Sequence, residues 1–176
     1  VHAARGGRSQ SWLTEDIMRM LIGILGIVVA LSLITPSGLF AQTDPAVGMW
    51  KLNLAKSTYV PGPAPKSEMR TYTASGKNGI KGKFDRVDAA GKSVTITYDA
   101  QYDGKDVPYT GSPDADAISV MKVDARTINA ILKKNGKVVQ TTKAVTSADG
   151  KVRTLTSTGT IAAGQKINNV TVFDRM

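Results

Sequence analysis

The sequence predicts an all-β fold, an up-and-down antiparallel β-barrel of about ten strands, from residue 42 onward. Short runs of alternating apolar and polar residues are separated by turn signals about every eight to twelve residues, as in sandwiches and barrels. Asn135-Gly136 joins two β-rich runs, and both residues tolerate the positive φ of a type I′ hairpin turn. No useful helical period follows Ala41, and Glu68 is the only glutamate among the acidic residues after it.

The barrel is expected to be preceded by a signal-peptide helix over residues 18–41. A basic start at Arg19 is followed by an apolar segment from Leu21 to Ile34 and by a small residue, Ala41, after which cleavage is predicted. An uncleaved membrane helix would need about 20 apolar residues. This run is shorter and ends at Pro36. We therefore expect a bacterial protein that is secreted or periplasmic, with membrane contact only through the signal peptide.

Composition excludes several kinds of chemistry. The chain has no cysteine, so disulfides, thiolate nucleophiles and thiolate metal sites are excluded. Its single histidine, His2, lies in residues 1–17, which we interpret as an over-extended N-terminus from a start codon placed too early. The expected mature domain, residues 42–176, then has no imidazole for catalysis or metal binding. We predict no cofactor, no metal and no catalytic residue for it.

Four strands are predicted in the first half of this domain. The clearest covers residues 93–102, where Val94, Ile96 and Tyr98 alternate with polar residues, as in a strand with one buried face. Prolines at 61, 63 and 65 exclude a helix or an inner strand there and predict a rigid extended crossing. The predicted strands are 48–53, 68–74, 80–87 and 93–102, with a helical turn or an irregular bend over 54–59.

The second half is predicted to begin with a turn at 103–105 and a short edge or bulged strand at 107–110, which contains Pro108. Five strands then follow, at 117–123, 127–134, 137–145, 151–159 and 165–174. These later strands do not alternate cleanly, because Lys143 shares a face with Val139 and Val145. A barrel with a partly polar interior and a sandwich edge with scattered exposed apolar residues both explain this pattern.

Two charged features have competing interpretations. The aspartates between residues 99 and 116 could form a calcium site or a carboxylate pair for glycoside hydrolysis. We prefer to interpret them as turn residues, because Asp-Gly and Pro-Asp are turn-forming sequences. The spacing of a calcium-binding EF-hand loop is also missing. The net charge of +8 from residue 42 onward is spread singly over strands and turns. It favours a solvated, aggregation-resistant surface over a nucleic-acid or anionic-surface site.

The segment Gly48-x-Trp50-Lys51-Leu52 resembles the start of a calycin, the superfamily of lipocalins and fatty-acid-binding proteins. That resemblance implies an up-and-down barrel in which Trp50 on the first strand is covered by an arginine near the last strand, here Arg175. The wider run Trp50-Lys51-Leu52-Asn53-x-x-Lys56-Ser57 also resembles uncharacterised secreted bacterial proteins. The fatty-acid-binding branch has an Arg-x-Tyr motif on its last strand, where this chain has Thr171-Val172-Phe173. The resemblance therefore supports the fold and not fatty-acid binding.

These observations lead to three functional hypotheses. The first is an exported, non-enzymatic, lipocalin-like monomer that binds a small amphipathic molecule inside the barrel. Tyr72, Tyr98 and Tyr102 are its candidate ligand-binding residues, because a phenol combines an apolar body with a polar tip. The second is an envelope interaction protein that binds an anionic polymer through its basic surface, and the third, which we rank last, is a carboxylate-based hydrolase. No specific nucleic-acid partner is expected.

Overall fold

Ten strands follow one another in a computed structural model that describes residues 44–160 and 164–176. The predicted N-terminal extension (1–17) and signal peptide (18–41) lie outside the described residues. Within the two described ranges, no helix is long and apolar enough to cross a membrane. The strands are β1 (Gly48–Leu52), β2 (Ser67–Ala74), β3 (Gly79–Val87), β4 (Ser93–Gln101), β5 (Asp103–Pro108), β6 (Ala117–Lys122), β7 (Thr127–Lys134), β8 (Lys137–Thr146), β9 (Val152–Thr160) and β10 (Lys166–Arg175).

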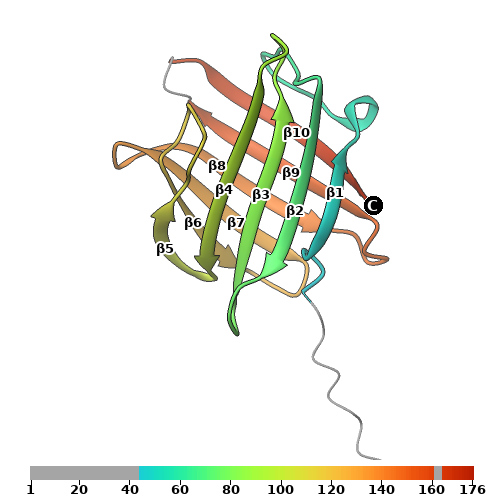
Figure 1. Cartoon of the computed structure of the whole chain (residues 1–176), viewed down its shortest axis with the longest axis vertical. Helices are drawn as coiled ribbons and strands as arrows, with labels where there is room; N and C mark the ends of the chain where they lie inside the picture. The colour runs from blue at the N-terminus through green and yellow to red at the C-terminus, as the bar shows by residue number, and fades with distance from the viewer. Residues whose placement is uncertain (1–43, 161–163) are drawn as a thin grey trace, which may run out of the picture. The chain divides into compact units, whose positions relative to one another are not determined.

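All ten strands belong to one antiparallel sheet that curls into a nearly closed barrel (Figure 1). Their order in the sheet is β4-β3-β2-β1-β10-β9-β8-β7-β6-β5, so every strand pairs with its sequence neighbour except at one place. Pairing of β1 with β10 joins the two ends of the chain's meander. The predicted ten-stranded up-and-down antiparallel barrel is therefore confirmed.

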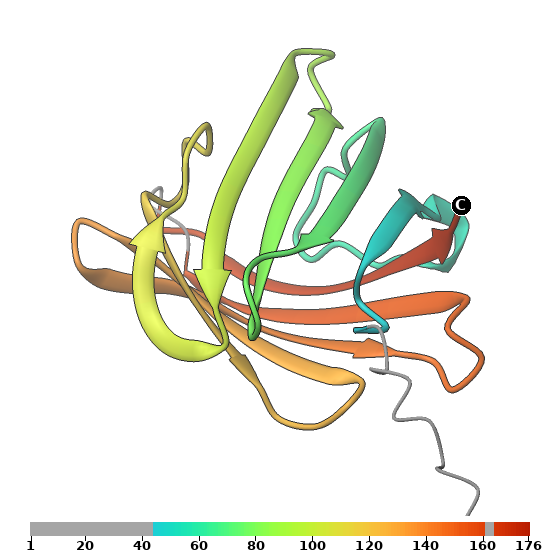
Figure 2. The same cartoon turned by 60° about the horizontal axis from the view of Figure 1, so that its bottom comes forward.

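The break in the sheet lies between β4 and β5 (Figure 2). These strands are consecutive in sequence but do not form a ladder with each other. A single bridge closes the seam, in which Thr97 N donates to Thr110 O at 2.9 Å and Thr110 N donates to Thr97 O at 3.0 Å. Thr110 lies just after β5, so the loop that follows this strand, rather than the strand itself, completes the barrel.

The predicted hairpin turn has the backbone that its sequence requires. Asn135 has φ of 49° and Gly136 has φ of 75°, and Lys134 pairs with Lys137 across them. Positive φ at both central positions defines the type I′ turn, whose twist matches that of the flanking strands. The turn fixes the register of β7 and β8, which carry one wall of the barrel interior.

A β-bulge explains why the later strands do not alternate cleanly. Leu132 pairs with Gln140 and Lys133 pairs with Val138, so Val139 has no partner opposite it on β7. The extra residue lets Val139 be buried while Val138 remains exposed. Of the two explanations for the irregular pattern, the barrel with polar inward positions is the one observed.

The predicted turn at 103–105 is wrong. Residues 103–105 form the first half of β5, and the chain reverses at Tyr102 instead. The pairing of β5 with β6 is irregular between Asp103 and Asp106, where Gly104 adopts φ of 74°. Asp-Gly therefore produces a bulge inside an edge strand here, because a positive-φ glycine serves a bulge as well as a turn.

The segment between β1 and β2 is short and mostly irregular. One 3-10 turn, η2 (Leu54–Lys56), is capped by Asn53, whose side-chain oxygen accepts a hydrogen bond from Lys56 N. Pro61, Pro63 and Pro65 then carry the chain back towards β2. The segment after residue 56 borders one end of the barrel interior.

Candidate functional site

The barrel interior contains two adjoining chambers. The inner chamber has a volume of about 110 Å³, and a second chamber of about 260 Å³, which we call the vestibule, opens towards residues 59–65. Five residues line both spaces: Arg70, Arg86, Asp114, Gln140 and Ser157. Ligand pockets typically start at about 300 Å³. The two chambers together reach that size, whereas the inner chamber alone does not.

Aromatic rings form one wall of the inner chamber. The ring centroids of Tyr72 and Phe84 lie 5.5 Å apart, those of Phe84 and Tyr98 5.8 Å, and those of Tyr98 and Tyr109 6.1 Å. Gly82 pairs with Tyr98 across β3 and β4, and a Cβ there would overlap the tyrosine ring. Only glycine leaves room for the ring at this position. Aliphatic side chains from β6 and β7 complete the lining: Ile118, Val120, Ile128 and Leu132.

Two phenols of this wall, those of Tyr98 and Tyr109, remain neutral. Burial raises the pKa of Tyr98 well above its usual value of 10 and raises that of Tyr109 to about 12. Both hydroxyl groups therefore carry a proton at neutral pH and can donate a hydrogen bond to a bound molecule. The wall thus combines apolar ring faces with polar tips.

A buried ion cluster lies where the two chambers meet. Glu68 is 2% exposed at its side chain and accepts hydrogen bonds from Arg70 Nε at 2.5 Å and Arg86 Nε at 2.7 Å. Burial acts to raise the pKa of Glu68, but the two guanidinium groups more than offset it, so the pKa is lowered. The Arg70 guanidinium also stacks between Phe84 and Phe173, 4.4 and 4.6 Å from the ring centroids.

Arg153 is a further buried cation. It comes from β9, is 4% exposed and lines the inner chamber. Its guanidinium carbon lies 4.8 Å from the centroid of Tyr72 and 6.0 Å from that of Trp50. Its Nε and Nη1 atoms are buried and have no hydrogen-bond partner among residues 44–160 and 164–176. A guanidinium in this state is costly, because ring faces attract its charge but accept no strong hydrogen bond.

Residues 44–47 close the end of the barrel opposite the vestibule, which we call the closed end. Asp44 Oδ2 accepts hydrogen bonds from Tyr102 Oη at 2.6 Å and Lys122 Nζ at 3.0 Å. Burial tends to raise the pKa of Asp44, but these contacts and the Ala46 amide lower it overall. Ala46 itself is buried in the core. The segment therefore reaches from β1 across to Tyr102, just after β4, and to Lys122 on β6.

Trp50 and Arg175 meet at the closed end. Trp50 is 0% exposed, and its Nε1 donates to Ala46 O at 2.9 Å. The guanidinium carbon of Arg175 lies 4.4 Å from the Trp50 centroid. Its three nitrogen atoms donate to backbone carbonyls at 2.5 to 2.8 Å, those of Pro45, Val47 and Gly150. The contact joins the first and last strands to the closing segment.

The three sequence-predicted tyrosines occupy different places. Tyr72 and Tyr98 line the inner chamber, whereas Tyr102 belongs to the Asp44 contact at the closed end and does not line that chamber. Their role in ligand binding stays a prediction. Sequence reasoning missed Phe84, Tyr109 and Arg153. The signal for Arg153 was its position two residues before Leu155, which places both side chains on the same face of β9.

Three of the aspartates that were considered for calcium or catalysis have ordinary partners. Asp99 accepts a hydrogen bond from Ser75 and pairs with Lys81, and Asp106 pairs with Lys133 at 2.6 Å. Asp103 accepts from the amide of Lys105, two residues along the chain. These contacts are those of strand surfaces and turns.

A broader groove of about 810 Å³ follows the outside of β1–β4. Outward-facing Lys51, Met69 and Asp85 lie along it and are paired across neighbouring strands. Several of its charged residues are exposed, including Lys51 and Asp85. Because it lies on the solvent side of the strands, this groove is a surface depression and not part of the interior.

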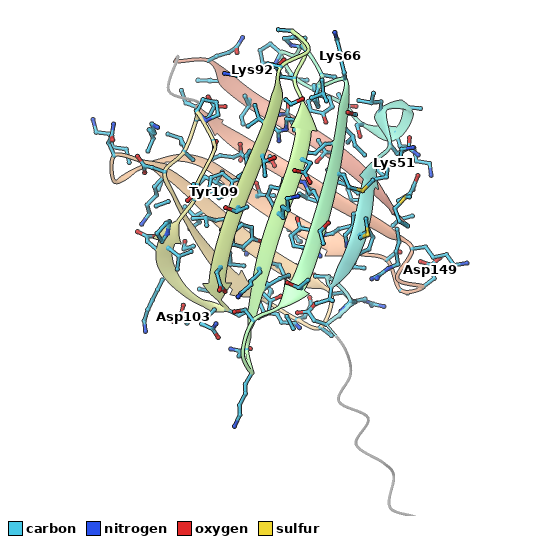
Figure 3. The ribbon with its side chains drawn as sticks, in the orientation of Figure 1. Lys51, Lys66, Lys92, Asp103, Tyr109 and Asp149 are labelled. Atoms are coloured by element: carbon cyan, nitrogen blue, oxygen red, sulfur yellow. The ribbon has the colours of Figure 1, made fainter. Side chains whose placement is uncertain are left out.

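The end of the barrel beside the vestibule, the open end, carries many lysines that pair with no carboxylate. Lys66 and Lys92 lie at this end, whereas Asp103 lies at the other (Figure 3). Five lysines sit at strand ends here and take part in no ion pair within the described parts of the chain: Lys66, Lys92, Lys134, Lys137 and Lys166. Asp88, Asp114 and Asp116 share the same end, so the charge there is mixed with an excess of cations.

Comparison with solved structures identifies the architecture. The wild-type fluorescent protein UnaG superposes with a TM-score of 0.51 at 13% sequence identity, over 74% of this chain and 97% of UnaG. A single-residue mutant of UnaG gives a TM-score of 0.50 at 14% identity, over 75% and 96% of the two chains. The fold is calycin-like. At this level of identity, the similarity between the calycin-like barrel and UnaG concerns the fold alone.

Other comparisons add no closer relationship. No protein-family model matches the chain, and no curated protein matches it either.

Proposed function

We propose that this protein is an exported, non-enzymatic, monomeric barrel that binds a small amphipathic molecule in its interior. The observation that carries the proposal is the pair of adjoining chambers, in which an aromatic wall meets buried cations. Apolar surface with a few convergent polar groups is the usual character of a small-molecule site. Export rests on the signal-peptide pattern of residues 18–41.

The interior is better suited to binding than to carboxylate catalysis. A glycosidase needs one carboxyl group that can release a proton and a second one facing it. Glu68, the buried carboxylate of the interior, is held ionised by Arg70 and Arg86. This arrangement removes it as a proton donor and makes it a structural anion.

Binding in the interior is tested with a small probe molecule and with a substitution that blocks the inner chamber. Native mass spectrometry of protein isolated from its own host is expected to show a retained small molecule, and calorimetry with 3-phenylpropanol gives a defined neutral probe. Ala130 faces the inner chamber, so Ala130→Phe is expected to abolish probe binding. Ile131, the next residue on β7, faces outward, and Ile131→Phe is the matched control that should keep it. No retained molecule and no probe binding, or equal binding by both variants, would refute interior binding.

The lysines at the open end favour a second candidate function, binding of an anionic polymer. Lys92→Gln/Lys166→Gln is expected to weaken retention on immobilised dextran sulfate, and the native retention should fall with added salt. The matched control is Lys77→Gln/Lys151→Gln, which removes the same charge from exposed turns at the closed end. If both double variants lose retention equally, the open end has no special role and only the net charge matters.

A further inference from the structure

We infer that the polar end of the bound molecule is an anion and that Arg153 receives it deep in the inner chamber. The inference deepens the proposed function and depends on it. It rests on Nε and Nη1 of Arg153, two buried donors without a partner among the described residues, in a side chain 4% exposed. A carboxylate accepts charge-assisted hydrogen bonds from a guanidinium and cancels its charge.

The other arginines near the interior already have acceptors. Arg70 and Arg86 share Glu68, and Arg175 donates to three backbone carbonyls. Arg153 lies against the ring faces of Tyr72 and Trp50, and its Nε and Nη1 have no acceptor among the described residues. Its remaining need is therefore a hydrogen-bonding anion, which the described residues do not supply.

The position of Arg153 sets the orientation and size of the ligand. Trp50, one of the two rings beside it, also contacts the segment that shuts the closed end, so the anionic group must enter first. The inner chamber of about 110 Å³ is smaller than the cavity of about 150 Å³ that holds benzene in another protein. It accommodates the head and the part of the apolar body that lies against the aromatic wall, while the rest of the body extends into the vestibule. The ligand class is a monocarboxylate with a compact, short apolar body.

This site is not the one that the family resemblance would have implied. The resemblance placed an Arg-x-Tyr motif on the last strand, where β10 carries Thr171, Val172 and Phe173. Arg153 comes from β9 and pairs with Phe173 across the two strands. Arg153 therefore lies beside Phe173, which occupies the tyrosine position of the motif, on a strand for which the resemblance implied no binding residue.

A matched ligand series tests the inference by calorimetry: 3-phenylpropanoate, 3-phenylpropanol and 3-phenylpropylamine share one skeleton and differ in charge. Because a charge-assisted hydrogen bond strengthens binding, the native protein should bind the acid with a dissociation constant about tenfold to a hundredfold lower than that of the alcohol. The amine should bind most weakly. In Arg153→Met the dissociation constants of the acid and the alcohol should differ by no more than about twofold, because methionine keeps the apolar volume and loses the charge.

A structural role for Arg153 makes a different prediction. If Arg153 stabilises the fold, Arg153→Met will lower the melting temperature. If Arg153 is an unsatisfied buried charge, the substitution should leave the melting temperature unchanged or raise it. Arg126→Met, on the exposed turn before β7, is the control for the same change in net charge and should keep the native preference. Alcohol binding that persists with no preference for the acid would overturn this inference and leave the proposed function standing. If none of the three probes binds the native protein, both this inference and the proposed function are refuted.

Discussion

Glu68→Gln is expected to destabilise the folded barrel by about 3 to 5 kcal/mol, one of the two largest effects of a single substitution here. The carboxylate of Glu68 is buried between the guanidinium groups of Arg70 and Arg86. A neutral amide would leave two cations facing each other in a partly buried site. Chemical denaturation monitored by circular dichroism measures the change in the free energy of unfolding. Asp85→Asn on the neighbouring strand, which breaks an exposed pair with Lys83, is the control and should change it far less.

The same substitution has a defined pH dependence. The pKa of Glu68 is lower in the folded protein than its usual value of 4.5, so its stabilising contribution is complete above that value. The contribution is lost as the pH falls through the folded-state pKa. The difference in unfolding free energy between native protein and Glu68→Gln should therefore be constant between about pH 6 and 8 and narrow in acid. A difference that widened in acid would contradict this account of the cluster.

Trp50→Ala is expected to cost about 3 to 5 kcal/mol of unfolding free energy, the usual range for deleting a buried aromatic side chain. Trp50 is 0% exposed and lies under Arg175 where the first and last strands pair. The substitution removes the ring on which Arg175 stacks and the hydrogen bond that Trp50 gives to Ala46 O. Thermal and chemical unfolding provide the measurement.

Trp50→Phe separates the two contributions of this residue. Phenylalanine keeps most of the buried apolar area and the ring face, but it cannot donate to Ala46 O. An intermediate loss of stability is expected, with local loosening of residues 44–47 detected by hydrogen exchange. A loss below about 1 kcal/mol for Trp50→Ala would mean that the closing segment and Arg175 hold the barrel without this ring.

The sequence pattern predicted correctly those features of the fold that depend on residues close together in the chain. The Asn135-Gly136 turn and the alternating strand over 93–102 correspond to the observed hairpin and to β4. Hairpin turns and strand faces depend on neighbouring residues, so they can be read locally. Asp103-Gly104 was misassigned because the same dipeptide suits a turn and a bulge, and only pairing with β6 decides between them.

The candidate site was much harder to predict, because its members lie far apart in the chain. Arg153 lies against Tyr72, which precedes it by 81 positions, and no local pattern connects the two residues. Glu68 was noticed as a lone glutamate, yet nothing in the sequence indicated that Arg86, on the next strand, would bind it. Even the inward tyrosines differ, since Tyr72 lines the chamber and Tyr102 binds the closing segment.

The sequence by itself determined that this chain would form a meander of paired strands around one interior, because alternation and turn chemistry are properties of neighbouring residues. Only the tertiary structure decided which polar groups that interior would contain and which of them would lack a partner. Closure through β1 and β10 brings β2 and β9 to facing positions, and whether a buried cation is satisfied depends on every side chain that the closure places around it.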